Sequence, residues 1–312
     1  MAKLPPYTTP LQRTWYYTFR FLTALVFLFL ITPILIILPL SFNAEPYFTF
    51  TSGMLSLDPE AFSLRWYQDI FTNGMANPDA TGAEWWSDMW NNAQWIRATK
   101  NSFFIGFFAT LLATSFGTLA AIGLSRSEMP FKGVIMSLLI SPMIVPLVVT
   151  AAGMFYFYSN DFNPFMEGKQ ALAGSKLGII LAHAALGTPF VIITVTSTLV
   201  GFDKSLTRAA ANMGAGPVRT FFKIQMPLIL PGVISGALFA FITSFDEVVA
   251  VLFLAGPEDK TIPRQMWSGI REQISPTILA VATILVFISI CLLTVLELLR
   301  RRSERLRGVT PH

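Results

Sequence analysis

Five long stretches of the sequence contain no Asp, Glu, Lys or Arg, and no other feature limits the possible folds as strongly. A helix crosses the roughly 30 Å hydrocarbon core of a bilayer with about 20 apolar residues, and each stretch reaches that length. A sixth stretch, residues 228–255, is equally apolar except for Asp246 and Glu247. The uninterrupted stretches are residues 21–40, 101–124, 133–156, 177–200 and 277–296. The sequence therefore predicts an all-α integral membrane protein with six transmembrane helices.

The amino-acid composition also indicates a membrane protein. Of the 312 residues, 53% are hydrophobic and only 13% are charged, whereas about 25% are charged in an ordinary soluble domain. The first apolar stretch is too long for a secretory signal peptide, so we expect it to be retained as a helix. The single cysteine, Cys291, lies in an apolar stretch. This excludes a disulfide framework and favours a small buried hydrophobe.

The distribution of basic residues predicts the orientation, because Lys and Arg near the spans stay on the cytoplasmic side. With the N-terminus inside, the cytoplasmic segments hold 14 of the 22 basic residues against four acids, and the outer segments hold eight against twelve. Both termini are therefore expected in the cytoplasm. Residues 1–20 form a cytoplasmic N-terminus, residues 21–300 the six-helix membrane domain and residues 301–312 a basic tail. This asymmetry explains the net charge of +4 without a nucleic-acid partner.

Residues 201–227 form the most informative loop, on the cytoplasmic side between the fourth and fifth spans. An amphipathic helical piece extends to Met213, the segment Gly214-Ala215-Gly216-Pro217 breaks the helix, and a second piece continues to Pro227. This pattern predicts a short helix-turn-helix on the membrane surface. The alternative is a single interfacial helix on lipid, which would not require a Gly-Pro break in its middle.

This loop resembles the cytoplasmic signature loop of permeases of binding-protein-dependent ABC importers of type I. The pattern is Glu-Ala-Ala, three residues, Gly, nine residues and then Ile-x-Leu-Pro. Matching residues stand at Ala209, Ala210, Gly214, Ile224 and Pro227, while Arg208 replaces the Glu and Met226 the Leu. The resemblance implies a coupling helix that docks on a separate ATP-hydrolysing subunit. Small residues at 209–211 and Gly214 would permit close approach, and Phe221 and Phe222 would fill an apolar cleft.

Further segments resemble the polyamine branch of these permeases: FSLRWYQDIF at 62–71, the segment 101–127 and SFDEVVAVLFLAG at 244–256. The resemblance implies a multi-pass protein of the bacterial inner membrane that imports a small cationic amine such as spermidine or putrescine. It also implies a second homologous permease, a homodimer of ATP-binding subunits and a periplasmic substrate-binding protein as partners. ATP and Mg would bind to the ATPase, with no cofactor or metal in this chain. The alternative substrate is an amino-acid derivative or an opine.

The sequence lacks the residues that other function classes need. His183 and His312 are the only histidines, so a metal site or His-based catalysis lacks its parts. His183 is expected to form a helix-packing hydrogen bond. GKQALAGSK at 168–176 has the wrong spacing for a phosphate-binding loop. An intramembrane enzyme would need a catalytic constellation, and an ion-coupled secondary transporter would favour an internal inverted repeat; we find neither.

The outer loop, residues 43–97, contains WWSDMWNNAQW within an insertion at 73–95 that has no assigned role. Tryptophan is enriched at bilayer surfaces. We therefore expect the four Trp side chains to lie at the membrane interface rather than to form a ligand cage. They are Trp85, Trp86, Trp90 and Trp95.

Asp246 and Glu247 are the candidate substrate contacts, because charges at membrane depth are costly and usually face a polar cavity or a partner. A stripe of small residues, Gly232, Gly236, Ala240 and Thr243, continues to Glu247 and predicts that Glu247 points into the helix bundle. The resemblance instead favours Asp246. Phe241 and Phe245 would add ring faces that attract an ammonium group. Two alternatives stay open: pairing with a basic residue of the companion permease, or a position at the outer interface.

Overall fold

The protein is helical throughout the residues that its computed structural model describes, which are 7–126, 128–159, 171–272 and 275–306. Within these ranges no strand forms, and one isolated antiparallel bridge joins Asn43 and Phe62. The predicted all-α fold is confirmed. The first residues of the N-terminal segment and residues 307–312 of the basic tail lie outside the described residues. The chain divides into two compact units, Met1–Ile70 with Gln273–Thr294, and Phe71–Glu272 with Val295–His312.

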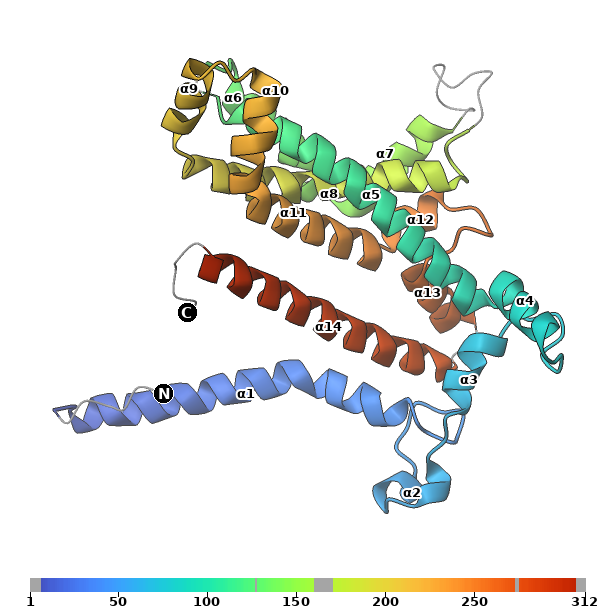
Figure 1. Cartoon of the computed structure of the whole chain (residues 1–312). Helices are drawn as coiled ribbons and strands as arrows, with labels where there is room; N and C mark the ends of the chain where they lie inside the picture. The colour runs from blue at the N-terminus through green and yellow to red at the C-terminus, as the bar shows by residue number, and fades with distance from the viewer. Residues whose placement is uncertain (1–6, 127, 160–170, 273–274, 307–312) are drawn as a thin grey trace. The chain divides into compact units, whose positions relative to one another are not determined.

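The first unit contains the two terminal helices, α1 (Pro10–Leu40) and most of α14 (Thr277–Leu306) (Figure 1). α1 begins with a capping box, in which Thr9 and Gln12 bond to each other's backbone N–H groups, and with Pro10 at its first position. Both helices contribute apolar side chains to a cavity of about 300 Å³, among them Ile37 and Phe287. Cys291, expected to be buried, is exposed on α14, so that prediction is wrong.

The segment after α1, residues 43–72, folds through hydrogen bonds to its own backbone. The buried Asn43 amide donates to the carbonyls of Tyr47 and Thr49, each at 3.0 Å. The Trp66 indole N–H donates to the Asn43 carbonyl at 2.6 Å. The short helices of this segment are α2 (Ser52–Leu55), η1 (Pro59–Ala61) and α3 (Arg65–Thr72). The Thr277 hydroxyl donates to Asp69 Oδ2 at 2.6 Å, which ties the start of α14 to α3.

Three long helices form the core of the second unit: α5 (Gln94–Leu124), α8 (Lys176–Val200) and α11 (Met226–Asp246). Buried small and branched side chains fill the space between them, including Ala113, Val191 and Ala240. α11 approaches α8 so closely that a Cβ at Gly236 would lie 2.9 Å from the Cα of Val191. The predicted stripe of small residues thus faces a neighbouring helix, which is α8 of the same chain.

The described residues contain four helical runs long and apolar enough to cross a membrane: Pro10–Leu40, Gln94–Leu124, Lys176–Val200 and Pro217–Asp246. The predicted span 133–156 is different. It consists of α6 (Lys132–Ile140), η2 (Ser141–Met143) and α7 (Leu147–Tyr158), with a bend of 97° between its two arms. Pro142 and Pro146 explain the bend, because proline removes a backbone donor and restricts the residue before it. The count of six spans and the cytoplasmic termini stay predictions.

The predicted span 228–255 is not one continuous helix. α11 ends at Asp246, and Glu247 adopts an extended backbone with φ −74° and ψ 121°. α12 (Val249–Leu254) then begins a second helix. Hydropathy could not show this break, because both sides of it are equally apolar.

The insertion at residues 73–95 contains α4 (Ala83–Asn92), which leads into α5. Trp95 is only 5% exposed and Trp85 packs against Met75 and Met89. The interfacial prediction is therefore wrong for Trp95, since this side chain is covered by protein. Trp86 and Trp90 are exposed. The Lys100 ammonium lies 4.5 Å from the centre of the Trp90 ring, a cation–π contact.

Candidate functional site

The end of α11 carries a cluster of three phenylalanine rings beside the two candidate carboxylates. The Phe241 and Phe245 rings stack with their centres 5.5 Å apart. Phe103 of α5 joins them, with its ring centre 5.1 Å from that of Phe245 and 6.5 Å from that of Phe241. Sequence reasoning missed Phe103. No local signal in the sequence marks it, because the approach of α5 to α11 exists only in the folded chain: a Cβ at Gly106, one turn further along α5, would lie 3.1 Å from the Phe241 ring.

The structure separates the two carboxylates that the sequence placed side by side. Asp246 is exposed, whereas Glu247 is 8% exposed. The predicted inward direction of Glu247 is confirmed, although the helix has already ended there. Its Oε1 accepts a hydrogen bond of 3.0 Å from the backbone N–H of Ala250 in the first turn of α12. Glu247 is therefore engaged with the protein backbone, and Asp246 is the accessible acid.

The C-terminal end of α11 adds negative potential near Asp246. Among the hydrogen bonds of the described residues, no backbone N–H beyond Asp246 donates to the last turn of α11. A helix with unsatisfied carbonyls at its C-terminus carries the equivalent of roughly half a negative charge there. The carboxylate, the helix end and the electron-rich ring faces all favour a cation. Neither ion pair found in the described part of the chain, Arg97–Glu258 or Lys176–Asp259, involves Asp246.

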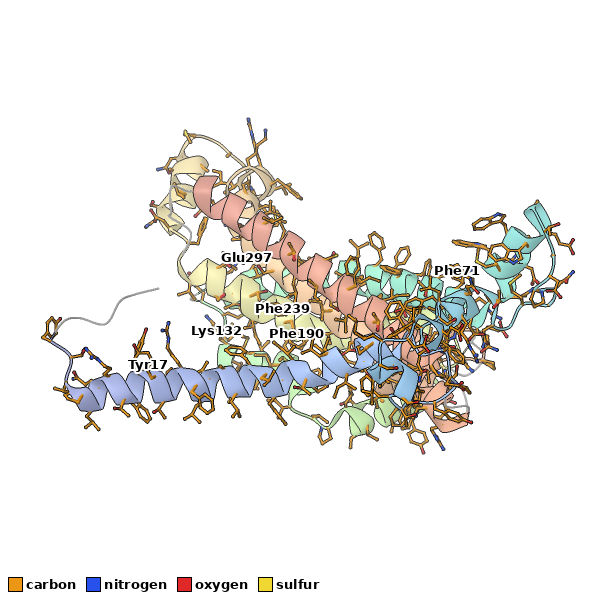
Figure 2. The ribbon with its side chains drawn as sticks, turned by 90° about the horizontal axis from the view of Figure 1, so that it is seen from below. Tyr17, Phe71, Lys132, Phe190, Phe239 and Glu297 are labelled. Atoms are coloured by element: carbon orange, nitrogen blue, oxygen red, sulfur yellow. The ribbon has the colours of Figure 1, made fainter. Side chains whose placement is uncertain are left out.

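A buried polar pair joins α8 to α11 two residues before Asp246. His183 Nδ1 and the Ser244 hydroxyl lie 2.8 Å apart, and both side chains are buried. This confirms the prediction of a helix-packing hydrogen bond for His183. Further from Asp246 along α11, Phe239 stacks on Phe190 of α8, with ring centres 6.3 Å apart (Figure 2). Polar and aromatic contacts therefore hold the α11 segment that leads to Asp246.

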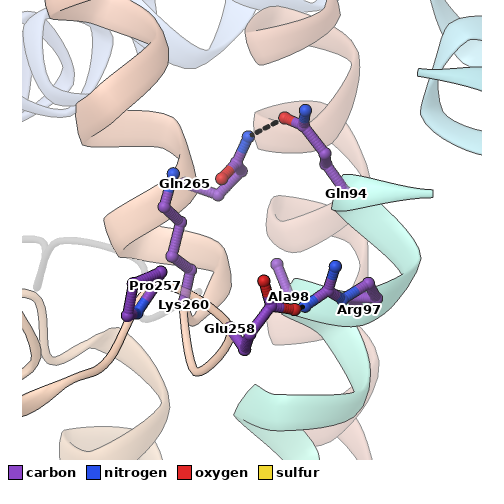
Figure 3. A pocket seen from close by; sticks show the side chains of 7 residues that line it. All are labelled: Gln94, Arg97, Ala98, Pro257, Glu258, Lys260 and Gln265. Carbon is purple, nitrogen blue, oxygen red and sulfur yellow. Dashed lines mark hydrogen bonds and ion pairs between the residues drawn. The ribbon is translucent and has the colours of Figure 1, made fainter. Parts of the chain in front are cut away.

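A polar cavity of about 210 Å³ lies beside the start of α5 (Figure 3). The side-chain amide of Gln265, on α13 (Ile262–Glu272), donates to Gln94 at 2.9 Å. The Asn101 amide donates to the backbone carbonyls of Glu258 and Lys260. The cavity is lined by Gln94, Arg97, Ala98, Pro257, Glu258, Lys260 and Gln265. These contacts fix the segment between α12 and α13 against α5.

Loop 201–227 has the predicted helix-turn-helix form, at the end of the second unit opposite α4 and α13 (Figure 1). α9 (Lys204–Asn212) ends in a turn where Gly214 has φ +81°. The Ala215 N–H donates to the Ala210 carbonyl at 3.0 Å and the Gly214 N–H to the Ala211 carbonyl at 2.9 Å, a Schellman motif. The second helix begins with Pro217 in α10 (Pro217–Thr220) and continues through a π-helical turn, η4 (Phe221–Gln225), into α11.

Asp203 caps the start of α9. Its carboxylate accepts hydrogen bonds from the Ser205 hydroxyl at 2.6 Å and from the Ser205 N–H at 2.8 Å. These two bonds, the hydroxyl's first, hold the pKa of the Asp203 carboxyl below its ordinary value. The cap and the glycine turn together define both ends of α9.

The residues predicted to couple to an ATPase differ in their exposure. Ala210 is buried within the chain at 1% exposure, so its role here is internal packing. Phe221 and Ile224 are half-buried. Two apolar side chains that sequence reasoning missed, Met213 and Val218, are strongly exposed on either side of the turn. The exposed predicted residues are Arg208, Ala209, Gly214, Phe222 and Pro227.

Two curated relatives match most of the chain. The spermidine/putrescine transport system permease protein PotC of Haemophilus influenzae is 30% identical over 282 residues, which is 89% of this chain and 95% of that protein. The putrescine transport system permease protein PotI of Escherichia coli K12 is 30% identical over 261 residues, 83% of this chain and 82% of that protein.

Solved structures match the fold at low sequence identity. A bacterial ABC transporter involved in the import of the acidic polysaccharide alginate has a chain that is 15% identical, with a TM-score of 0.65. The match covers 94% of this chain and 99% of that one. A family model, the inner membrane component of binding-protein-dependent transport systems, matches residues 113–307. Fold, relatives and family model agree: the chain belongs to the family of inner membrane components of binding-protein-dependent transport systems.

Proposed function

We propose that this chain is the transmembrane permease subunit of an ABC importer that moves a small cationic amine, a polyamine such as spermidine or putrescine, into the cytoplasm. The observation that carries the proposal is the accessible Asp246 at the negative end of α11, beside the rings of Phe103, Phe241 and Phe245. The names of the two permease relatives support the same substrate class.

The site fits the chemistry of a polyamine, which has ammonium groups separated by short methylene chains. The Asp246 carboxylate would pair with one ammonium group. The Phe rings would contact the methylenes and offer their faces to charge, with each cation–π contact worth about 0.5 to 2 kcal/mol. Phe241 and Phe245 keep the role predicted for them, and Phe103 joins them. Glu247 contributes to this site indirectly, because its carboxylate caps α12.

The energy for transport comes from ATP hydrolysis outside this chain, which acts as a transport component and not as an enzyme. A homodimer of ATP-binding subunits would bind ATP and Mg and receive the loop 201–227. The exposed apolar side chains of Met213, Val218 and Phe222 support a protein-docking role for this loop. A second homologous permease would complete the pathway. A periplasmic binding protein would deliver the substrate, and one alginate transporter of this fold has been solved with its periplasmic protein.

The test is uptake of labelled putrescine by the assembled complex in proteoliposomes, comparing wild type with Asp246→Asn. This nearly isosteric change removes the charge and leaves the side-chain shape. A hydrogen bond to a charged group contributes about 1.5 to 3 kcal/mol, so KM should rise roughly 10- to 150-fold. Glu84→Gln removes one charge from the exposed surface of α4 and should leave KM unchanged.

Unchanged KM and selectivity in Asp246→Asn would contradict the cation site. A competition series with unlabelled spermidine, an amino-acid derivative and an opine tests the substrate class. If an opine displaced putrescine more effectively than spermidine did, the alternative substrate class would replace the polyamine.

A further inference from the structure

The short helix α12 is held by a charged side chain at each end. At its N-terminus, the buried Glu247 carboxylate accepts the hydrogen bond from the Ala250 N–H. At its C-terminus, the half-buried Arg264 donates through Nη1 to the Val251 carbonyl at 3.1 Å and to the Ala255 carbonyl at 2.9 Å. A negative group at a helix N-terminus and a positive group at its C-terminus both oppose the helix dipole favourably.

The surroundings of α12 leave it little freedom once these bonds are made. Ala250, Val251 and Leu254 are completely buried, and Leu254 belongs to a cluster that includes Ile105 and Ile179. The Leu254 carbonyl accepts a further hydrogen bond of 2.8 Å from the Gly174 N–H. α12 is therefore fixed against α5 and α8, and the chain between α11 and α12 is short.

Glu247 makes its hydrogen bond at the point where the two helices separate. Residues 228–255 are apolar on both sides of the break and could continue as one helix. In a continuous helix the N–H groups after Asp246 would bond to the last carbonyls of α11. That change would remove the negative helix end beside Asp246. The capped break preserves it.

We propose that Glu247 and Arg264 are positioning residues, which hold α12 at its two ends and thereby keep Asp246 at an open, negatively polarised end of α11. Glu247 itself does not bind the substrate. This inference rests on the proposed role of Asp246 as the substrate carboxylate. Of the two candidate substrate contacts named from the sequence, it makes Asp246 the binding acid and Glu247 a structural acid.

A positioning role and a substrate-binding role for Glu247 predict different results when this residue is replaced by a neutral one. Glutamine keeps an acceptor oxygen at the same position and loses only the charge, whereas alanine loses the cap. Loss of a helix N-cap corresponds to roughly a 2- to 30-fold change in a conformational equilibrium. We therefore expect Glu247→Ala to raise KM for putrescine uptake within that range and Glu247→Gln to restore most of the lost affinity.

The experiment measures KM and Vmax together with hydrogen exchange of the peptide covering residues 247–255, in the assembled complex. Glu247→Ala and Arg264→Ala should both increase exchange in that peptide and raise KM, although Arg264 lies on α13. Glu247→Gln should show exchange close to wild type. The inference is overturned if Glu247→Gln loses as much affinity as Glu247→Ala, or if Arg264→Ala changes neither exchange nor KM.

These outcomes are distinguishable from failure of the proposed function. If Asp246 is not the substrate carboxylate, Asp246→Asn leaves KM unchanged while the exchange data still report whether α12 is held. If Asp246 binds the substrate but Glu247 also contacts it directly, Glu247→Gln raises KM without increasing exchange. That second pattern would refute the positioning role of Glu247 and leave the proposed role of Asp246 intact.

Discussion

Gly236 offers the sharpest test of how the membrane helices pack. A Cβ added at this position would lie 2.5 Å from the Thr194 hydroxyl oxygen and 2.9 Å from the Cα of Val191. The hydroxyl can rotate away, but the Cα belongs to the backbone of α8. Gly236→Ala should therefore force α8 and α11 apart at the centre of the core.

The expected cost follows from that geometry. Inserting one methyl group into a tightly packed core, where the backbone must move, destabilises by about 1 to 3 kcal/mol. For a domain of this size that corresponds to a decrease in Tm of roughly 2 to 12 °C. A matched control is Gly123→Ala on α5, where an added Cβ meets no atom within 4 Å. The control should be neutral or slightly stabilising, because alanine has the higher helix propensity.

The assay is thermal unfolding of the purified complex in nanodiscs, followed by the fraction that elutes as an assembled species in size-exclusion chromatography. Gly236→Ala should show the lower Tm and the lower recovery. Equal values for Gly236→Ala and Gly123→Ala would mean that α8 and α11 do not approach as closely as described, and the packing argument would fail.

Two further predictions concern the loops. Gly214→Trp should leave the complex assembled but abolish substrate-stimulated ATPase activity. The left-handed φ at Gly214 strains any L-residue, and the Trp side chain would cover the exposed turn. The control Gly216→Ala, at a position with φ −66°, should retain the stimulation. Stimulation at the wild-type level in Gly214→Trp would contradict the docking role. The backbone N–H of Asn77 and the side chain of Asn92 lower the pKa of the Asp88 carboxyl below 3.8. The stabilisation that the Asp88 carboxylate contributes should therefore be complete above about pH 4 and be lost as the pH falls through its lower folded pKa. Hydrogen-exchange protection of the Asn77 amide, which donates to this carboxylate, measures the loss. Protection that did not change with pH in this range would refute the prediction.

Part of the candidate site could be named from the sequence because its signals are local. Asp246, Phe241 and Phe245 stand within one helical turn or two of one another, and two charges in an apolar run are conspicuous. Phe103 could not be named, because its contact with Phe245 joins helices that are distant in sequence. The different environments of Asp246 and Glu247 were equally hidden, since the burial of Glu247 and its hydrogen bond from the Ala250 N–H are seen only in the folded chain.

The sequence by itself determined the membrane-embedded all-α class and the turn of loop 201–227. Both depend on short-range physics: apolar residues leave water over about 20 consecutive positions, and glycine followed by proline ends one helix and begins the next. Only the tertiary structure decided where apolar runs break. The bend of 97° in the third predicted span and the end of α11 at Asp246 lie inside segments of uniform hydropathy. In the second case, Glu247 and Arg264 make hydrogen bonds to the two ends of α12, and such contacts form only when the chain has folded.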